Sequence, residues 1–366
     1  MRAVGGLLGR GRDLVAGWPA AVAGSGLAPA RRLIGAAAGR PAAAPGTGGD
    51  DVRALGVGTH SRWVDLDGPV HYLDFGGPAS GPVIVCVHGL AGSAVNWSAI
   101  APLLAGTCRM LAVDLPGHGL TGSAGRGTGV PALQAVLHRF IEAVPAGPVI
   151  LFGNSMGGMI SLLEARAAPA AVAGVVLIDP VLPLVPAMPD HYVTPMLAGY
   201  AVPVLGPLLM SRRRRLSPEG LVHSILSLCC VDASRVPAGV VAQQVTVARQ
   251  ALVRPGTERE ISASARSMIA IFAGDLRGRA YRRAIGSISC PVLLLHGTRD
   301  RLVPIAVARA AARANPAWTL IEMPGVGHVP QLEAPDDTAG AITGWLGAAG
   351  QPAAQAASPA SPARPA

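Results

Sequence analysis

A pentapeptide near the middle of the chain, Gly-Asn-Ser-Met-Gly at residues 153–157, constrains the fold more than any other feature. It follows the apolar run 149–152 and precedes a helix-compatible stretch at 159–168. This context predicts a β-strand that turns sharply into an α-helix at Ser155. So tight a turn puts the serine in a strained backbone conformation, and glycines two residues to either side keep Cβ atoms out of the way. The hydroxyl of Ser155 would then stand clear of the sheet as a candidate nucleophile.

Partners for such a serine follow it in the sequence. A serine hydroxyl is a weak nucleophile at neutral pH, so an imidazole must take its proton and a carboxylate must orient that imidazole. The strand-like run 291–296 is followed by Asp300, and the run 318–323 is followed by His328. All three roles can therefore be filled, each by a residue just beyond a predicted strand.

Motifs upstream of the serine complete a pattern that resembles the α/β-hydrolase family. The strand-like run 83–87 ends in His-Gly-Leu at 88–90, and the run 109–113 ends in Asp-Leu-Pro-Gly-His-Gly at 114–119. Ser, Asp and His also follow one another in the chain order of that family. The resemblance covers about residues 63–346 of the chain.

The resemblance implies roles for particular residues. Ser155 would be the nucleophile, His328 the general base and Asp300 the acid, at the position after the penultimate strand where the family usually has it. The backbone N–H groups of Leu90 and Met156 would form the oxyanion hole. Asp179 is the alternative acid, because some relatives use the position after the preceding strand. Its Asp-Pro pair can equally terminate a strand, and we therefore favour Asp300.

The fold expected from these patterns is the α/β-hydrolase fold. Apolar and polar residues alternate on both sides of an Asp-Gly turn, which predicts a β-hairpin within residues 63–75. The later apolar runs alternate with helical stretches and predict a mainly parallel sheet flanked by helices. The longest gap between strands would hold a helical cap, inserted before the penultimate strand. We expect the core at 56–182 and 288–348 and the cap at 183–287, with extensions lacking regular structure at 1–55 and 349–366. A start codon assigned too far upstream would equally explain residues 1–55.

The cap sequence predicts several helices, around 196–210, 220–230, 236–253 and 261–272. Its apolar side chains are candidates for lining an acyl pocket, although helical spacing favours ordinary packing for any single one of them. The candidates are Leu197, Leu205, Leu208, Leu209, Met210, Ile225, Leu226, Ile269, Ile271 and Phe272.

Positive charge is concentrated in the predicted cap. All 30 basic residues are arginine, which together with abundant Ala, Gly and Pro favours a GC-rich bacterial coding sequence. The cap holds thirteen arginines and six acids, a net charge of +7, whereas the core carries a net charge of −3. The densest cluster is Arg212–Arg215. It is interpreted either as solvated surface or as a contact for an anionic membrane or an acidic substrate. Nucleic acid is not expected as a partner, because no recognised nucleic-acid-binding motif accompanies the charge.

Cysteine and histidine spacing gives no indication of a metal or cofactor. The five cysteines, Cys86, Cys108, Cys229, Cys230 and Cys290, lack C-x-x-C spacing, and the nine histidines lack a ligand motif such as H-E-x-x-H. Reduced thiols favour a cytoplasmic protein, with peripheral membrane contact through the basic cap as an open alternative. No apolar stretch reaches the length of about 18 residues that a membrane span requires.

Three functions remain open. The first is hydrolysis of a carboxylic ester of a hydrophobic small molecule or lipid through an acyl-enzyme. The second is C–C-bond hydrolysis of ring-fission products, which the segment 153–158 and Asn96-Trp97 resemble, although Val329 stands where that subfamily usually has an aromatic residue. The third is a non-catalytic ligand-binding role, which the intact Ser, Asp and His set disfavours. Relatives that act on epoxides or haloalkanes carry aspartate at the position of Ser155.

Overall fold

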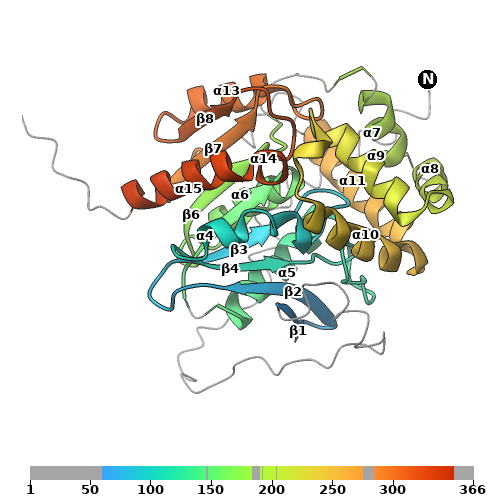
Figure 1. Cartoon of the computed structure of the whole chain (residues 1–366), viewed down its shortest axis with the longest axis horizontal. Coiled ribbons are helices and arrows are strands. Elements are labelled where there is room, and N and C mark those ends of the chain that lie inside the picture. The colour runs from blue at the N-terminus through green and yellow to red at the C-terminus, as the bar shows by residue number, and fades with distance from the viewer. Residues whose placement is uncertain are drawn as a thin grey trace, which may run out of the picture.

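The sheet at the centre of the molecule has the predicted mainly parallel arrangement. The structure, a computed structural model, describes residues 60–349 apart from 146, 184–189, 192, 203, 275–282 and 284. The expected extensions at 1–55 and beyond 349 lie outside these residues. In the described part of the chain, eight strands form one sheet in the order β1-β2-β4-β3-β5-β6-β7-β8 (Figure 1).

The sheet begins with an antiparallel hairpin and continues with parallel strands. β1 (Ser61–Asp65) pairs with β2 (Pro69–Gly76) through a turn in which Asp67 and Gly68 have positive φ angles of 55° and 119°. β2 pairs antiparallel with β4, and the other neighbours are parallel. The parallel strands are β3 (Val83–Val87), β4 (Arg109–Val113), β5 (Val149–Asn154), β6 (Val172–Ile178), β7 (Val292–Gly297) and β8 (Thr319–Met323). The predicted fold class is thereby confirmed.

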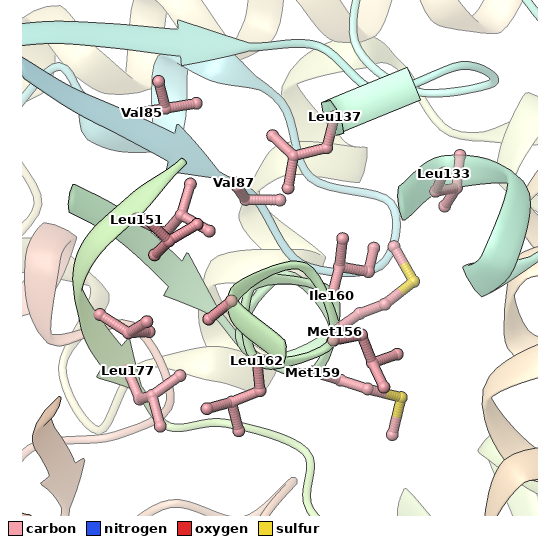
Figure 2. Close-up of a cluster of buried hydrophobic side chains, with 14 of the residues drawn as sticks. Val85, Val87, Leu133, Leu137, Leu151, Met156, Met159, Ile160, Leu162 and Leu177 are labelled. Atoms are coloured by element: carbon pink, nitrogen blue, oxygen red, sulfur yellow. The ribbon is translucent and has the colours of Figure 1, made fainter. Parts of the chain in front are cut away.

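Helices cover both faces of the sheet, so the parallel strands are buried on both sides, as their continuous apolar runs predict. One core layer lies between the sheet and α5 (Val130–Ala143), α6 (Met156–Ala167) and α13 (Ile305–Ala314). The other lies beneath η1 (Ala94–Trp97), α4 (Ala101–Leu104) and α15 (Pro335–Ala349). Figure 2 shows the first layer, where side chains of α6 meet Leu133 and Leu137 of α5 and Leu151 and Leu177 of the strands.

The insertion between β6 and β7 is helical, as predicted, and its helices gather at one end of the sheet (Figure 1). They are α7 (Val193–Ala201), α8 (Leu205–Ser211), η2 (Arg212–Arg215), α9 (Pro218–Cys229), η3 (Ala233–Arg235), α10 (Ala238–Val253) and α11 (Thr257–Gly274). The single helix expected at 196–210 is wrong, because α7 and α8 are separate and bend by 115° relative to each other. The sequence has Pro203 between them, and proline interrupts a helix because it lacks an N–H and clashes with the preceding turn.

Within the described residues, none of the helices taken singly has the length and apolar character to cross a bilayer. The bent pair formed by α7 and α8 with η2 meets that criterion only when its two parts are counted together.

A third apolar cluster joins the insertion to the segment after β8. Val222 and Leu226 of α9 and Val240 of α10 pack with Val329 and with Leu332 of α14 (Pro330–Glu333). Because His328 immediately precedes this segment, packing of the insertion also fixes the loop that carries the histidine.

Candidate active site

Ser155 sits at the turn from β5 into α6 and has the strained backbone that the sequence predicts, with φ 56° and ψ −118°. A Cβ atom on Gly157 would overlap the carbonyl oxygen of Val87, and one on Gly153 would lie 2.5 Å from the carbonyl oxygen of Gly157. Both glycines are therefore needed for the close approach of β5, α6 and β3. Ser155 is 8% exposed, and that exposure faces a cavity.

His328 and Asp300 come together from the loops after β8 and β7. Nδ1 of His328 lies 2.7 Å from Oδ2 of Asp300, while Oδ1 of Asp300 accepts backbone N–H bonds from Leu302 and Val303 at 2.7 and 3.0 Å. Because a carboxylate only accepts, Nδ1 of His328 carries the proton and its Nε2 is left able to take one. Burial alone would raise the pKa of Asp300, but the charge and hydrogen bond of His328 outweigh it and hold this pKa below its usual value.

Asp179, the alternative acid, lies beside Asp300 but has a different hydrogen-bond partner and the opposite pKa shift. Its Oδ1 accepts the N–H of Gly297 at 2.9 Å, and the residue is fully buried. Burial, and then the negative charge of Asp300, raise the pKa of Asp179 well above its usual value. Burial thus disfavours the charged form of Asp179, and the hydrogen bond of His328 runs to Asp300.

The loop after β3 approaches the serine from the other side. A Cβ atom on Gly89 would lie 3.0 Å from Cβ of Ser155, so this glycine lies beside the nucleophile, and the neighbouring Leu90 lines the same cavity as Ser155. Met156 is the first residue of α6, so its N–H has no partner within the helix. In the described part of the chain, neither the Leu90 nor the Met156 N–H donates a backbone hydrogen bond. Both donors remain available to a ligand, and the positive end of the α6 dipole lies at the same place.

Asp114 holds the 114–119 segment, one of the motifs noted in the sequence, in place. Its carboxylate accepts the N–H of Ala94 at 2.6 Å, the N–H of Leu120 at 2.9 Å and Nδ1 of His71 at 2.7 Å. These contacts hold the loop that follows β4 against the loop that follows β3.

One group of side chains has the spacing of metal ligands. Donor atoms of Asp179, His296 and Asp300 lie within 4.8 Å of one another. Nε2 of His296 is, however, 2.9 Å from the carbonyl oxygen of Val303, and Asp300 already bonds His328 and two backbone N–H groups. We interpret the group as the hydrogen-bonded surroundings of the Asp300 carboxylate.

A cavity of about 420 Å³ opens at Ser155 and His328 beneath the insertion. Its walls are largely apolar, and Leu90 and Val329 contribute beside the serine and histidine. The insertion contributes Met196, Tyr200, Met210, Leu216, Leu221, Val222, Ile225, Leu226, Leu228, Val247, Leu252, Ile261 and Met268 to the lining.

Only some of the residues expected to line an acyl pocket do so. Met210, Ile225 and Leu226 line the cavity. Leu205 and Leu208 are instead 42% and 60% exposed, and Leu209, Ile269 and Ile271 are not part of the lining. The expectation is wrong for these five because helical periodicity identifies an apolar face but not what that face meets. The side chains of Leu197 and Phe272 lie outside the described residues.

Two polar residues that sequence reasoning missed hold the site together. The side-chain amide of Asn154 donates to the carbonyl oxygens of Ile178 and His328, both at 3.1 Å, and so ties the turn at Ser155 to the histidine loop. Buried Glu333 accepts N–H bonds from Val231 at 3.0 Å and Asp232 at 2.9 Å, and its other oxygen accepts the N–H of Gly327 at 2.8 Å. The position of Asn154 inside the pentapeptide, directly before the candidate nucleophile, was a signal that could have identified it. Nothing local marks Glu333, because its partners on the insertion lie about a hundred residues away.

Comparisons with known proteins agree with this geometry. The model of the Alpha/beta hydrolase family matches residues 84–341. The Magnesium-chelatase 30 kDa subunit of Rhodobacter capsulatus is 31% identical over 283 residues, which cover 74% of this chain and 88% of that protein. The Pimeloyl-[acyl-carrier protein] methyl ester esterase of Aromatoleum aromaticum is 28% identical over 266 residues, which cover 70% of this chain and 95% of that protein. The crystal structure of a bacterial membrane phospholipase A superposes with a TM-score of 0.62 at 25% identity and covers 82% of this chain and 91% of that one.

Proposed function

The chain belongs to the α/β-hydrolase family and is a hydrolase, and we propose that it cleaves carboxylic esters of hydrophobic small molecules or lipids through an acyl-enzyme on Ser155. The observation that carries this proposal is the arrangement of the strained Ser155 and the His328–Asp300 pair at the floor of one largely apolar cavity. An esterase among the relatives, named for a methyl ester, supports the same class of bond.

In the proposed mechanism, Oγ of Ser155 attacks the ester carbonyl while Nε2 of His328 takes the hydroxyl proton. The carbonyl oxygen becomes an oxyanion, which the N–H groups of Leu90 and Met156 stabilise. Collapse of this intermediate breaks the C–O bond, and the departing alkoxide takes the proton from His328. Water, deprotonated by the same imidazole, then attacks the acyl-enzyme, and the acid product leaves with Ser155 restored. Asp300 keeps His328 oriented and stabilises its charged form throughout.

The shape of the cavity supports a hydrophobic acyl group. Its volume of about 420 Å³ lies toward the small end of the range for small-molecule sites, and Leu, Val, Ile and Met make up much of its largely apolar wall. Rates should therefore rise with acyl chain length until the cavity is filled and then decline. Initial rates on a series of 4-nitrophenyl esters measure this dependence.

A fluorophosphonate probe tests the nucleophile directly. It should label the wild-type protein at Ser155 and leave Ser155→Ala unlabelled, because only an activated serine reacts. Labelling that persists in the variant would contradict the assignment. A ring-fission dienoate assayed beside the esters separates ester from C–C hydrolysis, and cleavage of the dienoate without ester turnover would favour the latter.

The second candidate function is non-catalytic ligand binding. It draws on the relative named as a magnesium-chelatase subunit, which matches over most of both chains. A wild-type protein that neither reacts with the probe nor hydrolyses any ester would favour this function over the first.

A further inference from the structure

The cavity contains a guanidinium group that has no carboxylate partner among the described residues. Arg213 on η2 lines the cavity, and its hydrogen bond runs from Nη1 to the sulfur of Met210 at 3.6 Å. No ion pair of Arg213 occurs within the described part of the chain. Burial lowers the pKa of Arg213, although Tyr200 and Glu258 oppose that shift. Arg213 is only partly exposed, so an anion that entered the cavity would replace part of the hydration that this cation has lost.

A second guanidinium in the cavity wall is also incompletely paired. Arg254, directly after α10, donates from Nη1 to the carbonyl oxygen of Gly119 at 2.8 Å. Its Nε and Nη2 are shut off from solvent and have no acceptor among the described residues. Oε2 of Glu260 lies 4.0 Å from Nη2, too far for a hydrogen bond.

Acids lie near both arginines, but neither arginine forms a hydrogen bond with them: Glu260 forms only a long ion pair with Arg254, at 4.0 Å. Glu258 also lines the cavity, but both of its oxygens accept hydrogen bonds from Arg214. Nη2 of Arg214 also reaches the carbonyl oxygen of Arg254 at 3.5 Å, which brings η2 beside the end of α10. Arg213 and Arg254 therefore project positive charge into the cavity from neighbouring segments of the insertion.

The positive charge lies close to the catalytic loops. Gly119, which accepts from Arg254, belongs to the 117–119 segment of the cavity wall. The ring of His118 in that segment lies 5.1 Å from the ring of His88, and His88 immediately precedes the loop against Ser155. An acyl chain of moderate length could thus join the ester carbon at Ser155 to an anionic group at the arginines.

We infer that Arg213 and Arg254 form an anion subsite, and that the substrate is an ester whose acyl chain carries a second acid group as a carboxylate. This inference rests on the proposed function, since it identifies the class of ester. Planar guanidinium groups suit a carboxylate because each can offer it two parallel N–H bonds. The apolar walls between serine and arginines would contact the methylene chain.

A matched pair of substrates tests the subsite. 4-Nitrophenyl hexanoate and the mono-4-nitrophenyl ester of hexanedioic acid differ in one terminal group, a methyl or a carboxylate. The wild-type protein should have the higher kcat/KM for the half-ester. Arg213→Gln or Arg254→Gln should lower the half-ester to hexanoate ratio by about tenfold or more, as expected for loss of a charge-assisted hydrogen bond. Arg212→Gln and Arg215→Gln, which remove the same charge from exposed positions on η2, should leave the ratio unchanged.

The outcomes separate this inference from the proposed function. Hexanoate turnover that depends on Ser155, without preference for the half-ester, would overturn the anion subsite and leave the esterase standing. An equal loss of preference in Arg212→Gln would overturn it too, because net charge would then explain the effect. If neither ester is hydrolysed, calorimetry on Ser155→Ala decides: the monoamide of hexanedioic acid should bind at least about tenfold more tightly than hexanamide. Equal affinity there would also contradict the subsite.

A different observation concerns the outer surface of the same insertion. Val202, Val204, Leu205 and Leu208, around the bend between α7 and α8, are 43%, 83%, 42% and 60% exposed. Exposed Arg212 and Arg215 follow directly, and neither forms an ion pair within the described residues. The four arginines of the Arg212–Arg215 cluster differ in their surroundings, since Arg213 lines the cavity and Arg214 pairs with Glu258.

We propose that this surface, formed by Val202, Val204, Leu205 and Leu208 with Arg212 and Arg215, docks on an anionic lipid bilayer. Apolar side chains flanked by arginine suit the interface of a charged membrane. The apolar side chains enter the region between the headgroups and the acyl chains, and the arginines bind lipid phosphates. Met210 and Leu216 of the same region line the cavity, so docking would bring the cavity close to lipid-soluble esters. Each arginine attracts lipid phosphates electrostatically, and salt screens this attraction over a Debye length of about 8 Å at physiological ionic strength.

Cosedimentation with vesicles tests the docking surface. The wild-type protein should bind vesicles of phosphatidylglycerol and phosphatidylcholine more than vesicles of phosphatidylcholine alone, and high salt should weaken the binding. Val204→Ser with Leu208→Ser, and Arg212→Gln with Arg215→Gln, should each reduce binding several-fold. Leu103→Ser and Arg313→Gln, exposed residues on α4 and α13, are the matched controls. Equal binding to both vesicle types would overturn the proposal, and so would variants that bind like the wild type. A change in elution from a size-exclusion column, showing that the surface joins two copies of the chain, would overturn it as well.

Discussion

Ser155 holds a backbone conformation that costs a non-glycine residue about 1–3 kcal/mol. Its positive φ persists because β5, β3 and α6 approach one another too closely for the turn to relax. The same approach aims the hydroxyl into the cavity. Local strain at this residue is therefore offset by packing elsewhere in the fold.

At this scale the first prediction concerns the nucleophile and its base. Ser155→Ala and His328→Ala should each lower kcat by roughly four orders of magnitude or more, because the two groups act as a unit. The double variant should be no worse than either single one. Steady-state rates on the best 4-nitrophenyl ester measure all three, and additive losses in the double variant would show that the residues act separately.

The two neighbouring acids should respond differently to the same change. Asp300→Asn should lower kcat by up to about four orders of magnitude, because an amide cannot hold the Nδ1–H of His328 as a carboxylate does. Asp179→Asn should be much milder. Burial raises the pKa of Asp179 well above its usual value and so disfavours its charged form, and an amide oxygen can still accept the N–H of Gly297. If kcat ranks the two variants the other way, Asp179 is the catalytic acid.

His118 gives the protein a measurable sensitivity to acid. Burial, with the nearby His88 and Arg254, lowers the pKa of His118 to about 3. Between that value and the ordinary histidine pKa of about 6.5, the unfolded chain binds a proton that the folded protein does not, so stability falls as pH falls. His118→Gln should reduce the slope of unfolding free energy against pH by about 1.4 kcal/mol per unit between pH 6 and 4. Urea titrations at several pH values in this range measure the slope for the wild type and the variant.

At the scale of elements, the site depends on how closely α6 approaches β3. Gly157→Ala would push a methyl group into the carbonyl oxygen of Val87, so the variant should unfold at lower urea concentration and lose activity. Gly344→Ala on α15 is the matched control, because open space surrounds that position. It should stabilise the protein by up to about 1 kcal/mol through helix propensity. A tolerated alanine at 157 would contradict the packing described here.

The insertion and the core form one functional unit at the scale of the whole molecule. The carboxylate of Glu333 accepts N–H bonds from both sides, at Gly327 beside the histidine and at Val231 and Asp232 on the insertion. The backbone N–H of His328 also donates to the carbonyl oxygen of Cys229, at 2.7 Å. Placement of the histidine therefore depends on how the insertion docks.

Replacement of Glu333 tests this dependence. Glu333→Gln puts an amide NH₂ where a backbone donor now bonds, so it should cost about 2–4 kcal/mol of unfolding free energy and lower kcat as His328 loses its position. Glu322→Gln removes the same charge from an exposed ion pair between β8 and Arg309 of α13. It should change neither the unfolding free energy nor kcat much. Wild-type kcat in Glu333→Gln would show that the histidine loop holds its place without this carboxylate.

The sequence by itself determined the order of strands and helices, the turn at Ser155 and the positions of Asp300 and His328 after their strands. These features are local: apolar periodicity, glycine at a tight turn and chain order all act over a few residues. Such signals also placed the helical insertion before the penultimate strand, as the structure confirms.

Only the tertiary structure decided which charges and apolar side chains meet. Arg213 and Arg254 are two of 30 arginines in the sequence, and nothing local separates them from the solvated ones. The division of roles between Asp300 and Asp179 depends on burial and on a hydrogen bond that spans two loops. Glu333 acts on partners about a hundred residues away. Burial, hydrogen-bond geometry and electrostatic potential depend on distances through space, which the chain fixes only once it has folded.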